Sequence, residues 1–139
     1  SILEYDVNDG EIDGKSVAEK LNLSHEEIFK TLVTLSSTNE VYVFVIPVSC
    51  ELDLKKAALA VSEKSISMLP VKDILKVTGY VKGGCSPIGM KKDYPSVFDE
   101  SIILLDKITF NAGKIGLQVQ LSTSDLDKII DYKVLDICK

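Results

Sequence analysis

The run VYVFVIPV, residues 41–48, is apolar at almost every position, and this pattern constrains the fold more than any other in the chain. A strand that is apolar on both faces is typical of the middle of a sheet whose two faces are both covered. The run FKTLVTL, residues 29–35, is also rich in β-branched and aromatic residues, and the polar SSTNE segment after it predicts a hairpin. Pro47 marks the end of the second strand. We therefore expect residues 41–48 to form a central strand.

Strands and helices are mixed along the rest of the chain without a regular βαβ alternation. Helical patterns occur at 14–23 with Asp13 as cap, at 52–62, at 71–79 and from Ser122 or Thr123 onward, and a Ser-x-x-Glu capping box at 24–27 predicts one short turn. Short strands are expected at 1–6, 66–69, 96–106, 107–110, 115–121 and 132–137, with a hairpin turn in NAGK, residues 111–114. A chain of 139 residues, 45% of them hydrophobic, supplies one core and little more. The sequence therefore predicts a single compact α+β domain, residues 1–139, around a mostly antiparallel or mixed sheet.

Charge is distributed unevenly along this acidic chain, whose formal net charge is −5. Residues 55–92 hold 8 Lys and 2 Asp/Glu, a local charge of +6, whereas residues 1–54 hold 3 Lys and 11 Asp/Glu, a charge of −8. A basic segment of this kind is compatible either with solvated helix faces or with a surface that attracts phosphate. All 16 basic residues are lysine, so any contact with nucleic acid should be mostly electrostatic and poor in base reading.

Several kinds of chemistry are disfavoured by the residues present. Three scattered cysteines and one histidine form no zinc pattern, and no metal or cofactor is expected. Cys85 and His25 would make a thiolate–imidazole pair only if they met, and the alternative is a buried thiol beside an exposed histidine. No run approaches the roughly 18 apolar residues of a membrane span, and the first residues do not resemble a secretory signal. Reduced thiols in a cytoplasmic protein are the simplest interpretation.

The segment GYVKGGCSPIGMKK, residues 79–92, combines four glycines with three lysines. It does not match a nucleotide-binding P-loop. Gly83 and Gly84 can nevertheless bring backbone N–H groups against a ligand, and such groups stabilise an oxyanion without help from a side chain. Lys30 begins an apolar strand, where it either reaches the surface along its own alkyl stem or orients a carbonyl or a phosphate.

Five stretches in order along the chain resemble the YbaK/EbsC family of free-standing deacylases, which edit mischarged Cys-tRNA(Pro) and are related to the editing domain inserted in bacterial prolyl-tRNA synthetases. The stretches are FKTLV (29–33), LDLKKAA (52–58), TGYVKGGCSPIGMKK (78–92), FNAGKIGLQVQL (110–121) and SDL (124–126). The resemblance implies a mixed α/β domain with a barrel-like sheet. It also implies that no cofactor is needed, that the substrate is the CCA end of an aminoacyl-tRNA, and that prolyl-tRNA synthetase is a partner.

The resemblance further implies roles for particular residues. Lys30 positions the aminoacyl-tRNA terminus, and the Gly83 backbone lies near the reacting carbonyl, so these two are the expected catalytic residues. The expected substrate-binding residues are Tyr5, Thr31, Gly84, Ser86, Pro87 and Asn111. Lysines of the basic segment would meet tRNA phosphates: Lys55, Lys56, Lys82, Lys91 and Lys92. In such enzymes a cysteinyl substrate supplies its own thiol, which attacks the ester carbonyl and leaves as a thiolactone.

The sequence also departs from the family pattern. Asn111 stands where a serine is common and Ile115 where arginine is usual, which affects pocket polarity and tRNA contacts. The family's N-terminal helix before the first strand is not found in the sequence. Three functions remain open: a deacylase for Cys-tRNA(Pro), with Cys-tRNA(Cys) as a further substrate; a deacylase for another mischarged tRNA such as Ala-tRNA(Pro); and a non-catalytic module that binds tRNA or a synthetase.

Overall fold

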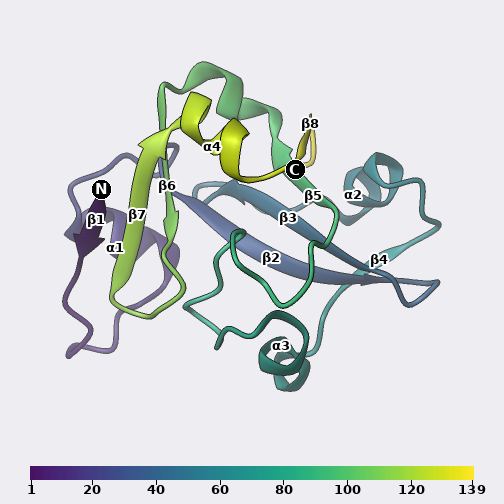
Figure 1. Ribbon diagram of the computed structural model, residues 1–139, viewed down its shortest axis with the longest axis horizontal. Coiled ribbons are helices and arrows are strands. Elements are labelled where there is room, and N and C mark those ends of the chain that lie inside the picture. The colour runs from purple at the N-terminus through teal and green to yellow at the C-terminus, as the bar shows by residue number, and fades with distance from the viewer.

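The computed structural model describes all residues, 1–139, as one α+β domain built on two sheets (Figure 1). The larger sheet has five strands in the order β4-β2-β3-β5-β8, and the smaller has three in the order β1-β7-β6. The strands are β1 (Ile2–Glu4), β2 (Phe29–Ser36), β3 (Val41–Pro47), β4 (Ile66–Met68), β5 (Ser96–Asp99), β6 (Lys107–Asn111), β7 (Leu117–Ser122) and β8 (Lys133–Leu135). The helices are α1 (Gly14–Lys20), α2 (Leu54–Ala60), α3 (Val71–Thr78), α4 (Thr123–Ile129) and the 3-10 helix η1 (Glu100–Leu104). No helix is long and apolar enough to cross a membrane.

Strand β3 lies in the middle of the larger sheet, as its apolar sequence predicts. It pairs antiparallel with β2, with Phe29 opposite Pro47 and Leu35 opposite Val41, and it pairs parallel with β5 on its other side. Residues 43–47 of β3 are all buried. The expected hairpin of residues 29–35 and 41–48 is thus confirmed. The sheet is mixed, because β5 runs parallel to β3 and β8 runs parallel to β5.

The two sheets meet at the start of β2, but they do not close into a barrel. A single bridge joins Ile28 to Thr109 of β6, where the Thr109 N–H donates to the Glu27 carbonyl over 3.2 Å. The α+β fold expected from the sequence is confirmed, but the barrel-like sheet that the resemblance implies stays open, because the ladder between the sheets ends after this one bridge. The junction places the first residues of β2 beside the β6–β7 hairpin (Figure 1).

One predicted strand is mostly helical. Residues 96–106 form β5 only as far as Asp99, and η1 follows. The Asp99 carboxylate accepts a hydrogen bond from the Ser101 N–H over 3.1 Å, and this cap starts the helical turn. Within the apolar run IILL, which favoured a strand, Ile102 is buried in the core, whereas Ile103 and Leu104 face solvent.

The core is divided between the two faces of the larger sheet. One cluster contains Phe29, Val45, Phe98 and Phe110 and fills the space between the sheets. A second cluster packs Phe44 and Ile46 against α2. Because successive residues of β3 point to opposite faces, this strand supplies both clusters, and it holds the start of β2 rigidly in place.

Candidate functional site

A hollow of about 450 Å³ opens where the two sheets meet. It lies against the start of β2, the glycine-rich loop and the β6–β7 hairpin, and we call it the site hollow. Six of the predicted site residues line it: Tyr5, Lys30, Thr31, Lys82, Gly83 and Asn111. These residues come from four separate parts of the sequence, so the fold brings together what the chain keeps apart.

Lys30 is the second residue of β2, and it lies opposite Ile46 of β3. Its neighbour Phe29 is buried in the core between the sheets, so the alternation of the strand turns Lys30 to the other face. The Lys30 side chain is half-buried, lines the site hollow and makes no ion pair or hydrogen bond within the protein. Its ammonium group is therefore available to a ligand.

Glycine is required at two consecutive positions of the loop. Gly83 has φ = 88°, a left-handed conformation that side chains rarely adopt. A Cβ added at Gly84 would lie 3.2 Å from the backbone nitrogen of Ile115 and 3.3 Å from Cα of Lys114. The loop thus packs directly on the backbone of the β6–β7 turn.

Several N–H groups of this loop have no protein acceptor. The Gly84 N–H donates to the Val81 carbonyl over 3.1 Å, but the N–H groups of Gly83, Cys85 and Ser86 donate to nothing within the protein. Cys85 and Ser86 are buried, and a buried N–H without an acceptor is uncommon. Free backbone donors beside the site hollow suit the oxygen of a polarised carbonyl.

Three buried side-chain oxygens around the site hollow also lack hydrogen-bond partners. They are Tyr5 Oη, Thr31 Oγ1 and Gln118 Oε1. Native proteins leave few buried polar atoms unsatisfied, so three in one place indicate a position for a polar ligand. The three oxygens belong to neutral groups that can accept hydrogen bonds.

Gln118 is a site residue that the sequence pattern did not reveal. It lies opposite Asn111 across the β6–β7 hairpin and is 4% exposed. Its Nε2 donates to Asn111 Oδ1 over 2.8 Å. The Asn111 Nδ2 group takes no part in that hydrogen bond and can donate to a ligand. The sequence showed only a glutamine in a predicted strand beside a predicted turn. The register of the hairpin is needed to show that Gln118 contacts Asn111.

Three of the predicted substrate-binding residues do not line the site hollow. Gly84 packs on the hairpin turn, as described above. Ser86 is buried, and its Oγ accepts the Ile88 N–H over 3.3 Å, so it shapes the loop. Pro87 faces a different and larger hollow.

The predicted phosphate-binding lysines do not form one surface. Lys82 lines the site hollow, and Lys92 lines the larger hollow. Lys56 donates to Asp136 Oδ2 over 2.9 Å and to the Cys138 carbonyl over 2.8 Å, and the hydrogen bond to Asp136 raises its pKa. Lys55 is exposed on α2, and the Lys91 stem packs beside Gly79.

Cys85 and His25 are not arranged as a catalytic pair. Cys85 packs in a cluster with Val33 and Leu69, and burial raises the pKa of its thiol to about 11. His25 does not line the site hollow, and its Nε2 lies 3.7 Å from Glu19 Oε1. Because a protonated thiol is a poor nucleophile, Cys85 is a packing residue here. No group of three or more His, Cys, Asp or Glu side chains is arranged to hold a metal ion.

Known proteins resemble this chain in sequence and in fold. The aminoacyl-tRNA editing domain model matches residues 13–129. The candidate Cys-tRNA(Pro)/Cys-tRNA(Cys) deacylase EbsC of Enterococcus faecalis is 44% identical over 119 residues, which is 86% of this chain and 73% of that relative.

Solved structures share the fold at lower identity. A candidate trans-editing enzyme for prolyl tRNA synthetase superposes with a TM-score of 0.89 at 20% identity, over 100% of this chain and 86% of the other. The hypothetical protein APE2540 superposes with a TM-score of 0.89 at 22% identity, over 100% of this chain and 91% of the other. Together with the motif resemblance, the domain match and the relative at 44% identity show that this chain belongs to the aminoacyl-tRNA editing domain family.

Proposed function

We propose that this protein is a trans-editing deacylase that removes cysteine from mischarged Cys-tRNA(Pro), with Cys-tRNA(Cys) as a further substrate. The composition of the site hollow supports this function most directly. It combines two unpaired lysines, Lys30 and Lys82, with free backbone donors and unpartnered neutral oxygens, and it lacks a side chain suited to act as nucleophile. A site of this kind fits a substrate that supplies its own nucleophile.

The cysteinyl ester provides that nucleophile. The substrate thiol loses its proton and its sulfur attacks the carbonyl carbon of the same residue, which forms the C–S bond and places negative charge on the carbonyl oxygen. The C–O bond to the ribose then breaks, the ribose oxygen takes up a proton, and the amino acid leaves as a cyclic thiolactone. The protein's part is to orient the ester and to stabilise the oxyanion.

Each feature of the site has a role in this reaction. The free N–H groups around Gly83 stabilise the oxyanion. The Lys30 ammonium holds the terminal nucleotide, which places the ester against the loop. The oxygens of Tyr5, Thr31 and Gln118 accept hydrogen bonds from the α-ammonium group, and the Asn111 amide donates to the ribose. Lys82 contributes positive charge at the rim of the hollow.

Recruitment by prolyl-tRNA synthetase belongs to the same proposal. A lysine-only basic segment provides weak contacts that do not read sequence, so selection of tRNA(Pro) requires a second source of recognition. The synthetase, which has just released the mischarged tRNA in the cytoplasm, provides it.

The test is a single-turnover reaction of purified protein with Cys-tRNA(Pro). Cysteine should be lost much faster than in buffer alone, and Lys30→Ala should abolish most of the acceleration. Binding of the tRNA without any acceleration would instead favour a non-catalytic module that retains the editing fold.

A further inference from the structure

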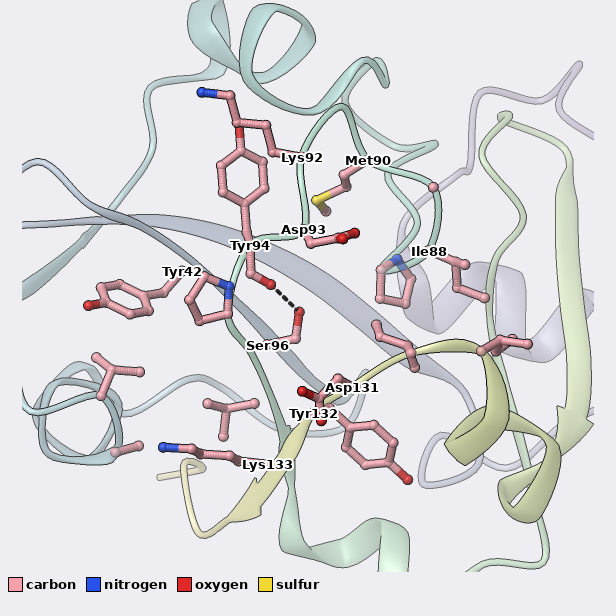
Figure 2. Close-up of a pocket in the computed structure, with 18 of the residues that line it drawn as sticks. Tyr42, Ile88, Met90, Lys92, Asp93, Tyr94, Ser96, Asp131, Tyr132 and Lys133 are labelled. Atoms are coloured by element: carbon pink, nitrogen blue, oxygen red, sulfur yellow. Dashed lines mark hydrogen bonds between the residues drawn. The ribbon is translucent and has the colours of Figure 1, made fainter.

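A second hollow of about 730 Å³ lies outside the site described above (Figure 2). It is bordered by the end of α2, the segment 87–97 and the segment 129–133 that joins α4 to β8. Its apolar lining includes Tyr42, Tyr94 and Tyr132 together with Pro87, Ile88 and Met90. None of the residues that line it also lines the site hollow. We call it the second hollow.

The tyrosine rings at the second hollow are held by their own hydroxyl groups. Tyr42 donates to Glu63 Oε2 over 2.7 Å, and Tyr94 donates to the Val77 carbonyl over 2.8 Å. Tyr132 donates to Asp127, and its ring packs on Phe98 with centroids 4.6 Å apart. The aromatic surfaces are therefore fixed before any ligand arrives.

Four charged side chains around the second hollow have no partner in the protein. Lys92, Asp93, Asp131 and Lys133 line it, and their charged groups make no ion pair and no side-chain hydrogen bond. Figure 2 shows them arranged around the tyrosines, with Asp131 from the segment before β8, Lys133 from the first position of β8, and Lys92 and Asp93 from the glycine-rich loop and its continuation. Both a cationic and an anionic contact are thus available to one ligand.

The glycine-rich loop connects the two hollows. Lys82, Gly83 and Cys85 line the site hollow, whereas Pro87, Ile88 and Gly89 line the second hollow. Gly83 and Pro87 are four residues apart, so their Cα atoms are separated by at most about 14 Å. A short piece of single-stranded RNA spans that distance.

We propose that the second hollow binds a cytidine nucleotide of the single-stranded CCA end, next to the aminoacylated adenosine. Bases stack on aromatic side chains in proteins that bind single-stranded nucleic acid. Aspartate accepts hydrogen bonds from the exocyclic amino group of cytosine, and lysine meets phosphate. The second hollow offers all three contacts, and the shared loop places it at the right distance. The assignment rests on the proposed function, because it takes the site hollow to hold the terminal adenosine.

The experiment is a titration of the ¹⁵N-labelled protein with cytidine monophosphate, uridine monophosphate and the trinucleotide CCA, followed by amide chemical shifts. Cytidine monophosphate should shift the amides of residues 87–97 and 129–133. It should bind roughly three- to tenfold more tightly than uridine monophosphate, which lacks the amino group, because one net hydrogen bond is worth about that much. The trinucleotide should shift the amides of both hollows.

Two pairs of substitutions separate the contacts. The double variant Asp93→Asn, Asp131→Asn should remove the preference for cytidine over uridine. The double variant Lys92→Ala, Lys133→Ala should weaken the binding of both nucleotides. The control variant Lys64→Ala, Lys107→Ala removes the same charge at exposed lysines outside either hollow, and it should change the binding much less. All six side chains are exposed, so the variants should fold.

The results distinguish failure of the subsite from failure of the proposed function. Shifts confined to the site hollow, or equal affinities for the two nucleotides in the unchanged protein, would overturn the cytidine subsite. If Cys-tRNA(Pro) is deacylated with an unchanged KM in both double variants, the cytidine subsite is contradicted and the deacylase function is supported. If cytidine monophosphate binds the second hollow but no aminoacyl-tRNA is deacylated, the deacylase function is contradicted and the nucleotide site is supported.

Discussion

At the scale of single residues, the proposed deacylation depends first on Lys30. Its ammonium has no partner in the protein and its side chain is only half-buried, so Lys30→Ala removes a ligand contact and little packing. We expect deacylation to fall about 10²- to 10³-fold, as when a single stabilising donor is removed from an active site. Circular dichroism should show an unchanged melting temperature. Lys64→Ala, at an exposed lysine away from the site hollow, is the matched control and should keep full activity. A large fall in the melting temperature of Lys30→Ala would make Lys30 a structural residue.

Two threonines of β2 test whether unpartnered oxygens belong to the substrate site. Thr31 Oγ1 is buried without a partner, whereas Thr34 Oγ1 donates to the Tyr42 carbonyl over 2.8 Å. Thr31→Val should therefore leave stability unchanged or raise it, and it should raise KM for Cys-tRNA(Pro). Thr34→Val should lose about 1 kcal/mol in the free energy of unfolding and keep its activity. Urea denaturation and steady-state kinetics measure both effects, and the reverse pattern would exclude Thr31 from the substrate site.

Cys85 provides a test that excludes enzyme-thiol catalysis. Burial raises its pKa to about 11, so the side chain is a protonated thiol throughout the working range of the protein. Cys85→Ala should keep nearly the same rate of deacylation between pH 6 and 9 as the unchanged protein. A loss of activity with the fold preserved would restore the thiolate hypothesis.

Asn111 and Gln118 show what could be predicted at the residue scale. The motif resemblance identified Asn111, Tyr5, Lys30 and Gly83, and all four line the site hollow. Gln118 was missed because its role depends on hairpin register, which sets it opposite Asn111. A shift of the register by one residue would turn Gln118 to the other face of the sheet, and the local sequence does not exclude such a shift.

At the scale of elements, the glycine-rich loop is tied to the β6–β7 turn by close packing. Gly84→Ala would push its methyl group against the backbone of Lys114 and Ile115, and Gly83→Ala would strain a left-handed conformation at a cost of about 1–2 kcal/mol. We expect both variants to lose stability and activity together.

Gly10→Ala is the control for backbone strain alone. Gly10 has φ = 74°, a Cβ there meets nothing within 4 Å, and the residue does not line the site hollow. It should show a similar loss in the free energy of unfolding by urea denaturation, while the rate of deacylation stays intact. If Gly10→Ala lost as much activity as Gly83→Ala, general destabilisation would explain the loop's effect.

The same elements show how far local patterns determine structure. The β2–β3 hairpin was predictable because its strands are long, β-branched and separated by a polar turn. The helical turn η1 was not, because its apolar sequence resembles a strand and the cap from Asp99 decides its conformation. The open junction of the two sheets was also missed, since the point at which a ladder ends depends on packing between distant strands.

At the scale of the whole molecule, the fold holds a small site with a few polar groups at the junction of two sheets, and it supplies neither a metal cluster nor a paired nucleophile and base. In the proposed reaction, the substrate's own thiol performs the attack. The most direct measurement compares the rates at which the purified protein deacylates Cys-tRNA(Pro), Ala-tRNA(Pro) and Ser-tRNA(Pro) in single turnover. We expect rapid loss of cysteine and little loss of alanine or serine. Loss of alanine at a rate similar to that of cysteine would contradict attack by the substrate thiol, because alanine has no thiol and its release would require an attacking water positioned by the protein.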